Sequence, residues 1–192
     1  MAKAAAKTTA KAKSKAQTKK NASQPTASKS TTGKHKAGTP PERIADERLY
    51  WLFKSEPDKF SWDQLVAKGD TGEEWDGVRN YLARNNMRAM RIGDLGFFYH
   101  SNAGKDIVGI CEICALSHQD STTDDERWDC VDVRAICAMP NPVTLGDVKN
   151  TDELSEMALV TAMRLSVQPV TAAEWALVCK MGGLDPDKIE AQ

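Results

Sequence analysis

The first forty residues constrain the fold most, because they contain almost nothing that a folded core could bury. They combine ten lysines with alanine, serine and threonine, and they include no acidic residue. A segment of this composition does not bury enough apolar surface to offset the entropy lost on ordering. We therefore predict a disordered basic tail over residues 1–43 and one folded domain over residues 46–188, which is long enough to build a core.

Charge divides the chain near the same boundary. The total formal charge is −1, but residues 41–192 hold 16 of the 26 basic residues and all 27 acidic ones, which makes −11. An acidic domain does not adhere broadly to nucleic acid, whereas the lysines of the tail could attach to DNA or RNA without sequence preference. The alternative for the tail is a role in solubility alone.

The sequence contains no pattern typical of export or membrane insertion. No apolar run reaches the roughly 18 residues that a membrane helix requires, and the N-terminus lacks the hydrophobic stretch of a signal peptide. We expect an intracellular protein, in the cytoplasm or nucleoid of a bacterium or in a eukaryotic nucleus, with no membrane partner. These features do not determine the oligomeric state.

Five cysteines are an odd number, and most of them lie in apolar runs. This favours a reducing compartment and buried thiols. Cys111 and Cys114 have the C-x2-C spacing, but they lie in a predicted strand, where side chains three apart point to opposite faces. Because no second ligand pair follows, we expect no metal. We also expect no cofactor.

Hydrophobic patterning predicts an α+β domain. The near-continuous apolar character of several runs favours strands covered on both sides, as in a small barrel. We predict a small, mostly antiparallel β-barrel with helices packed around it. The predicted strands are residues 48–53, 95–102, 106–117 and 128–139.

Helices are predicted from capping patterns and from apolar spacing. Capping boxes begin at Ser61 and at Thr171, and each predicts the start of a helix. Residues 79–90 and 152–163 carry apolar side chains at helical spacing. Residues 164–169 read as an extended link between helices, which ends at a proline.

The stretch WDGVRNYLARNN, residues 75–86, concentrates planar hydrogen-bonding side chains beside an indole. Binding a nucleobase takes an apolar surface for stacking, polar groups aimed at the base edge and cations for phosphate. Trp75 could supply the surface, and the arginines and asparagines that follow could supply the rest. The alternatives are that Trp75 is a core residue and that Arg79 and Arg84 cover an acidic neighbour or face solvent.

A second polar segment, YHSN, ends a predicted strand. Ser101 and Asn102 could pair with a base edge, or they could simply form a turn. His100 with Ser55 or Ser101 could also be imagined as a nucleophile–base pair. However, the sequence has no nucleophile elbow, H-E-x-x-H motif, phosphate loop or dinucleotide fingerprint. We therefore expect no catalysis, with an enzyme acting on a modified nucleotide in the same pocket as the alternative.

Six blocks occur in an order that resembles the EVE domain family: YWLFKSEP, WDGVRNYLARNNMRAM, GDLGFFYHSN, VGICEI, WDCVDV and MRLSVQPVT. The resemblance covers residues 48–182. It implies a fold similar to PUA and YTH domains and a non-enzymatic reader of modified bases, with 5-methylcytosine or 5-hydroxymethylcytosine in DNA as the expected mark. A reader of modified RNA is the alternative. The acidic loop LSHQDSTTDDERW lacks the aromatic–proline–acid step that family members often carry.

The resemblance also places a single-nucleotide pocket on the matched motifs. The roles within it are our inference from residue chemistry: Lys54, Arg79 and Arg84 hold phosphate, and Trp75 stacks on the base. The helix that follows Gly77 would favour a negative group at its N-terminus. The expected pocket residues are Lys54, Ser55, Trp75, Val78, Arg79, Asn80, Arg84, Tyr99, His100, Ser101, Asn102, Arg164 and Ser166.

Overall fold

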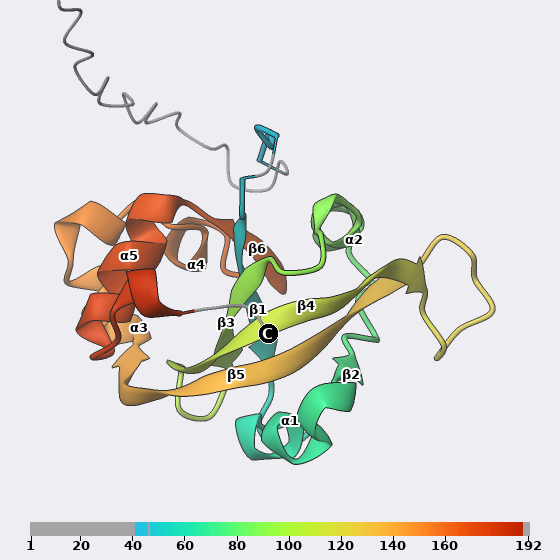
Figure 1. Cartoon of the computed structure of the whole chain (residues 1–192), viewed down its shortest axis with the longest axis horizontal. Coiled ribbons are helices and arrows are strands. Elements are labelled where there is room, and N and C mark those ends of the chain that lie inside the picture. The colour runs from blue at the N-terminus through green and yellow to red at the C-terminus, as the bar shows by residue number, and fades with distance from the viewer. Residues whose placement is uncertain (1–40, 46, 190–192) are drawn as a thin grey trace, which may run out of the picture. The chain divides into compact units, whose positions relative to one another are not determined.

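The structure is a computed structural model that describes residues 41–45 and 47–189 (Figure 1). Nearly all of the tail predicted over residues 1–43 lies outside the described residues. The predicted domain, residues 46–188, falls almost entirely within them. None of the helices in this part of the chain has the length and apolar character that crossing a bilayer requires.

A six-stranded sheet forms the centre of the domain, in the order β2-β5-β4-β3-β1-β6. Four of the five strand pairings are antiparallel, and the pairing of β1 with β3 is parallel. The mixed α+β class is therefore confirmed, and the sheet is mostly antiparallel. The strands are β1 (Tyr50–Ser55), β2 (Glu73–Glu74), β3 (Leu95–His100), β4 (Asp106–Gln119), β5 (Asp129–Thr144) and β6 (Val167–Val170).

The sheet does not close, which corrects the predicted barrel. Closure requires the two edge strands to pair with each other, but the edges here are β2 and β6, of two and four residues. Pro169 lies in β6 and has no amide proton to donate, which suits a sheet edge. The apolar runs that suggested a barrel instead reflect an open sheet covered on both faces.

Two hydrophobic clusters cover the two faces of the sheet. Alternating residues of β1 separate them, with Trp51 and Phe53 in the first cluster and Leu52 in the second. Helices α1 (Trp62–Lys68) and α2 (Tyr81–Ala89) pack on the first cluster. Helices α3 (Leu145–Lys149), α4 (Ala158–Thr161) and α5 (Ala172–Met181) gather on the second (Figure 1).

Both predicted capping boxes are present. Ser61 and Gln64 cap α1 reciprocally, and Thr171 and Glu174 do the same for α5. The helix predicted over residues 79–90 begins later, at Tyr81, because the Asn80 side chain accepts hydrogen bonds from the first free amides of α2. These local signals were sufficient because capping involves residues only a few positions apart.

Two other predictions were wrong. Residues 152–163 form a short 3-10 helix (Asp152–Leu154) and then α4, because Met157 adopts an extended backbone (ψ 139°) and is fully buried. Part of the predicted link 164–169 is β6, which pairs with β1. In both cases packing on the core decides the local conformation.

Candidate functional site

A pocket of about 550 Å³ opens where β1 ends, within the size range of small-molecule sites. Its walls come from the turn after β1, from β2 and from the loop that leads into α2, and Ser166 precedes β6. The lining residues are Lys54, Ser55, Glu56, Lys59, Phe60, Glu73, Glu74, Trp75, Asp76, Gly77, Val78, Arg79 and Ser166.

Trp75 belongs both to the core and to the pocket wall. Its side chain is only 7% exposed and packs edge-on against Phe53, Phe60 and Phe98, with ring centroids 5.0–6.3 Å apart. Most of the Trp75 surface is therefore buried in the core, as the alternative prediction had it. Only a small part of the indole remains for contact with a bound molecule, alongside Val78 and Phe60.

Asp120 fixes the loop between Trp75 and α2. Its carboxylate accepts hydrogen bonds from the Gly77 amide (3.0 Å) and from the Arg79 guanidinium (2.6 Å). Gly77 adopts φ +69°, a conformation that favours glycine. Burial alone would raise the pKa of Asp120, but hydrogen bonds from Thr122, Arg79 and Gly77 together lower that pKa to about 2. The carboxylate is therefore ionised, and Arg79 is largely neutralised.

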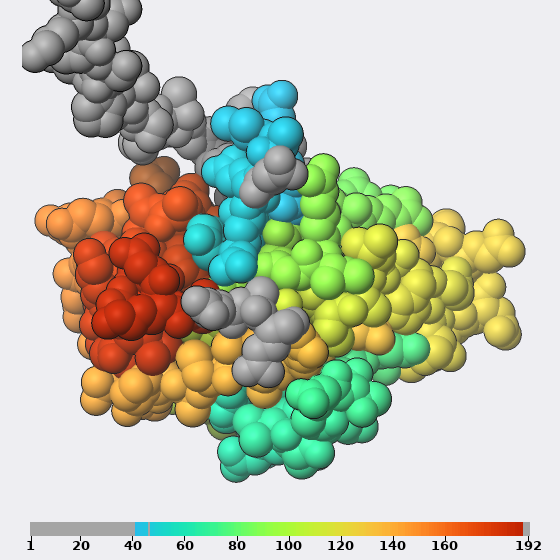
Figure 2. Space-filling model, in the orientation of Figure 1, coloured from blue at the N-terminus to red at the C-terminus, as the bar shows by residue number. Residues whose placement is uncertain are grey.

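Asp120 and Thr122 come from the loop between β4 and β5, which is drawn in yellow in the space-filling view (Figure 2). This is the acidic segment that lacks the aromatic–proline–acid step. Arg79 reaches it twice, through Asp120 and through the Thr122 hydroxyl at 3.2 Å. The loop therefore holds Gly77 and Arg79 of the pocket wall in position.

Lys54 is a partly buried cation of the pocket. Its ammonium group donates to the Met163 carbonyl (3.0 Å) and lies 6.0 Å from the centroid of the Tyr99 ring. Burial lowers the pKa of Lys54 to about 8, so the side chain stays mostly protonated at neutral pH. This cation is available to a bound oxygen atom at little further desolvation cost.

Carboxylates outnumber cations around the pocket, with four acids against Lys54, Lys59 and Arg79. Burial, followed by the charges of Asp120 and Glu74, raises the pKa of Asp76. Such a lining does not suit a phosphate, but it offers acceptors to a group that carries N–H protons. The acids are Glu56, Glu73, Glu74 and Asp76.

The structure brings six of the thirteen predicted site residues together in the pocket lining: Lys54, Ser55, Trp75, Val78, Arg79 and Ser166. Asn80 and Arg84 lie just beyond it on α2. Asn80 caps the helix, and Arg84 lies over the Tyr81 ring and donates to the Arg127 carbonyl (2.8 Å).

The remaining predicted residues hold the surrounding structure. His100 Nε2 accepts a hydrogen bond from the Trp62 amide (3.2 Å), and the Ser101 amide and hydroxyl both donate to the Ser55 carbonyl. Asn102 has φ +65° in the turn after β3. Tyr99 is buried in the second cluster, and Arg164 is exposed between α4 and β6.

Seven lining residues were absent from the predicted set: Glu56, Lys59, Phe60, Glu73, Glu74, Asp76 and Gly77. A signal existed for three of them, since Glu56 lies in the KSEP block and Asp76 and Gly77 lie inside the WDGVRN block. The acids of β2 had no such signal, because a two-residue strand leaves no pattern in a sequence.

Comparisons with known proteins find a matching family model and several similar proteins. The model of the EVE domain matches residues 49–181. The chain is 36% identical to mouse thymocyte nuclear protein 1, over 71% of this chain and 75% of that protein. A crystal structure of an Agrobacterium tumefaciens protein is 64% identical, with a TM-score of 0.72, over 75% and 99% of the two chains. Human THYN1, in complex with 5-methylcytosine containing DNA, is 34% identical, with a TM-score of 0.67, over 72% and 99%.

Proposed function

This chain belongs to the EVE domain family, and on that basis we propose that it is a non-enzymatic reader of modified bases that encloses one methylated or hydroxymethylated cytosine of DNA. The pocket at the end of β1 carries the proposal, because it lies in the region matched by the family and has room for a base. A family member, human THYN1, is known in complex with 5-methylcytosine containing DNA.

The acids of the pocket suit an amino-bearing base. The N4 amino group of cytosine donates hydrogen bonds, and aspartate and glutamate are its usual acceptors in proteins. Asp76 and Glu74 are the lining carboxylates next to Trp75 in the chain. A base without an amino group at this edge, such as thymine, would offer no donor to the Asp76 carboxylate, which disfavours its binding.

The mark itself adds little binding energy. A methyl group buries roughly one CH₂ equivalent, about 0.8 kcal/mol. Its recognition must therefore come from fit against the apolar part of the wall, formed by Phe60, Trp75 and Val78. A hydroxymethyl group could add a hydrogen bond. Extrusion of a base from a duplex costs a few kcal/mol, so single strands and mismatches should bind more readily.

Phosphate contacts belong outside the pocket. Arg79 is neutralised by Asp120, whereas Arg164 is exposed and Arg84 lies on α2 beside the pocket loop. We assign the backbone of the nucleic acid to Arg84 and Arg164, assisted by the lysines of residues 1–40. In this arrangement the pocket selects the base and the surface cations supply affinity without sequence preference.

The central experiment measures binding of fluorescent oligonucleotides that contain one cytosine, 5-methylcytosine or 5-hydroxymethylcytosine, as single strands and as duplexes. We expect tighter binding of a marked strand, and we expect Asp76→Asn to weaken cytosine-containing ligands by about tenfold, the value of one good base contact. Asp63→Asn, an exposed acid on α1 outside the pocket, is the matched control. Equal affinity for marked and unmarked strands would refute the proposal.

The same titrations with RNA decide between DNA and RNA as the ligand. Enzymatic conversion is tested by the mass of the oligonucleotide after incubation with the protein. Conversion is not expected, because His100 Nε2 accepts a hydrogen bond from Trp62 and Ser101 donates to the Ser55 carbonyl. His100 and Ser101 are thus not arranged as a base in contact with a nucleophile.

A further inference from the structure

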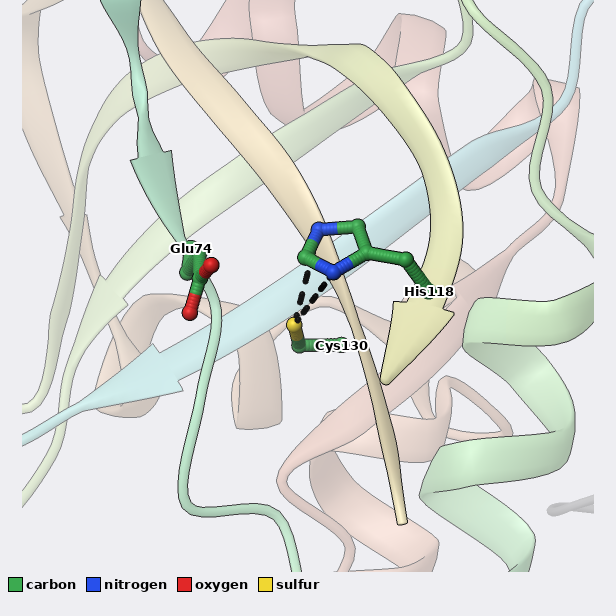
Figure 3. A group of neighbouring side chains, drawn as sticks. All are labelled: Glu74, His118 and Cys130. Atoms are coloured by element: carbon green, nitrogen blue, oxygen red, sulfur yellow. Dashed lines mark hydrogen bonds between the residues drawn. The ribbon is translucent and has the colours of Figure 1, made fainter. Parts of the chain in front are cut away.

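Three potential metal ligands lie on neighbouring strands beside the pocket. They are Glu74 on β2, His118 on β4 and Cys130 on β5, and their ligand atoms all lie within 4.8 Å of one another. Figure 3 shows the imidazole of His118 and the thiol of Cys130 facing each other, with the Glu74 carboxylate beside them. The three residues are 12 or more positions apart in the sequence, so no spacing motif predicts that they form a site.

The register of the strands places these side chains on one face of the sheet. His118 is paired with Cys130, and Glu74 is paired with Asp132. Cys130 and Asp132 are two residues apart on β5, so their side chains point to the same side. The cluster is thus a product of strand pairing and not of a flexible loop.

We propose that Glu74, His118 and Cys130 bind a divalent transition metal, with Zn²⁺ as the best match. Thiolate, imidazole and carboxylate are the ligands that zinc takes in proteins, at about 2.3 Å from sulfur and about 2.0 Å from nitrogen or oxygen. In a tetrahedral site these lengths separate sulfur and nitrogen by about 3.5 Å. Cys130 Sγ lies 3.6 Å from His118 Nδ1.

Local charge favours a cation at this point. Glu74 lies directly opposite Asp132 in the antiparallel register, and like charges in that position repel. Asp76 and Asp120 add negative charge from the pocket loop and from the β4–β5 loop. The nearby guanidinium of Arg79 is already paired with Asp120. A divalent ion would offset the repulsion between the strands.

A hydrogen-bond partner for the second ring nitrogen of His118 is also in place. His118 Nε2 lies 2.8 Å from Asp132 Oδ1, which favours a proton on Nε2, so that Nδ1 can bind the metal once it leaves the Gln119 carbonyl, 3.0 Å away. A carboxylate that accepts from the second ring nitrogen is the common partner of a metal-bound histidine. Asp132 therefore acts as a positioning residue, and the three protein ligands leave one coordination position for water.

Binding requires two small movements. Cys130 Sγ is 3.6 Å from both ring nitrogens, so it faces the ring, and the imidazole must turn to direct Nδ1 at the metal. The His118 side chain is 38% exposed, which permits this turn at the loss of its contact with the Gln119 carbonyl. The Glu74 carboxylate must give up the hydrogen bond that it accepts from the Ser121 hydroxyl. The metal then replaces the thiol proton, which is released to water.

Cobalt(II) is the probe, because a thiolate ligand gives it a charge-transfer band in the near ultraviolet. Untagged full-length protein, freed of metal with a chelator, is titrated with Co²⁺. We expect one equivalent to produce the band and Zn²⁺ to abolish it by displacement. His118→Ala and Glu74→Gln should each weaken Co²⁺ binding at least tenfold.

Cys130→Ser should abolish the band, whereas Cys114→Ser, a half-buried thiol on β4, should retain it. Circular dichroism of each metal-free variant separates loss of ligand from loss of fold. The proposal is overturned if wild-type protein gives no band, or if the band survives in folded Cys130→Ser. Oligonucleotide binding by metal-free protein tests base recognition separately, so the failure of either proposal leaves the other standing.

Discussion

Asp120 holds the backbone of the pocket in place from a distance of more than forty residues along the chain. Its carboxylate is fully buried and accepts from the Gly77 amide and from Arg79. The hydrogen bonds depend on its negative charge, and together they outweigh the burial that would otherwise favour the protonated form. The conformation of the pocket is thus linked to the ionisation of one side chain.

This link predicts a dependence of stability on pH. The pKa of Asp120 is lowered from 3.8 to about 2 in the folded protein. A lowered folded-state pKa contributes stability above the unfolded value, and that stability is lost as the pH falls from about 4 to about 2. The contribution amounts to about 2 kcal/mol at neutral pH.

Asp120→Asn should therefore lower the melting temperature at neutral pH, and its difference from wild type should shrink as the pH falls through that window. Thermal melts followed by circular dichroism measure both curves. Asp124→Asn, an exposed acid of the same loop, is the control and should follow wild type. Parallel curves for Asp120→Asn and wild type down to about pH 2 would contradict the assignment.

At the scale of elements, α1 packs closely on the sheet where its Trp62 ring meets Gly109 of β4. A Cβ atom added to Gly109 of β4 would lie 2.5 Å from the Trp62 ring of α1. Trp62 is buried against Phe98, so the ring has little room to move. The absence of a side chain at Gly109 is what allows the helix to approach β4 so closely.

We expect Gly109→Ala to destabilise the protein by about 1–3 kcal/mol, the usual cost of overpacking a core. Gly146→Ala in α3 is the matched control, because its Cβ would meet only the Thr144 hydroxyl at 3.4 Å. Alanine is favoured over glycine in helices, so the control should be neutral or slightly stabilising. Urea unfolding measures both, and equal midpoints would count against the contact.

The capping box of α5 gives a second prediction at this scale. The Thr171 hydroxyl accepts from the Glu174 amide, and the Glu174 carboxylate accepts from the Thr171 amide. Thr171→Ala should lower the free energy of unfolding by about 1 kcal/mol. Binding of modified oligonucleotides should not change, because α5 packs on the second cluster, away from the pocket lining. A loss of binding in this variant would place the ligand elsewhere.

At the scale of the whole molecule, a basic segment precedes an acidic domain. If residues 1–40 attach to nucleic acid through phosphate, their deletion should weaken binding to random duplex and flatten its dependence on salt. The preference for a marked base should remain, because the pocket lies within residues 54–166. Anisotropy at several salt concentrations measures both effects. An unchanged salt slope would mean that the tail takes no part in binding.

The sequence by itself determined the mixed class, the main strands, the capped helix starts and the family. These features depend on residues close together in the chain or on long matched blocks, such as Ser61 with Gln64 or YWLFKSEP. Lys54, Trp75 and Arg79 were placed in the pocket for the same reason, since each lies in a matched block.

Only the tertiary structure decided the open sheet, the break at Met157 and the acids that β2 contributes to the pocket. Each depends on contacts between distant residues, which no local pattern records. Asp120 reaches Gly77 across 43 positions, and Glu74, His118 and Cys130 meet only because three strands pair in a particular register. Side chains that converge through sheet register cannot be recognised before the pairing is known, because a shift of one residue would send them to the opposite face.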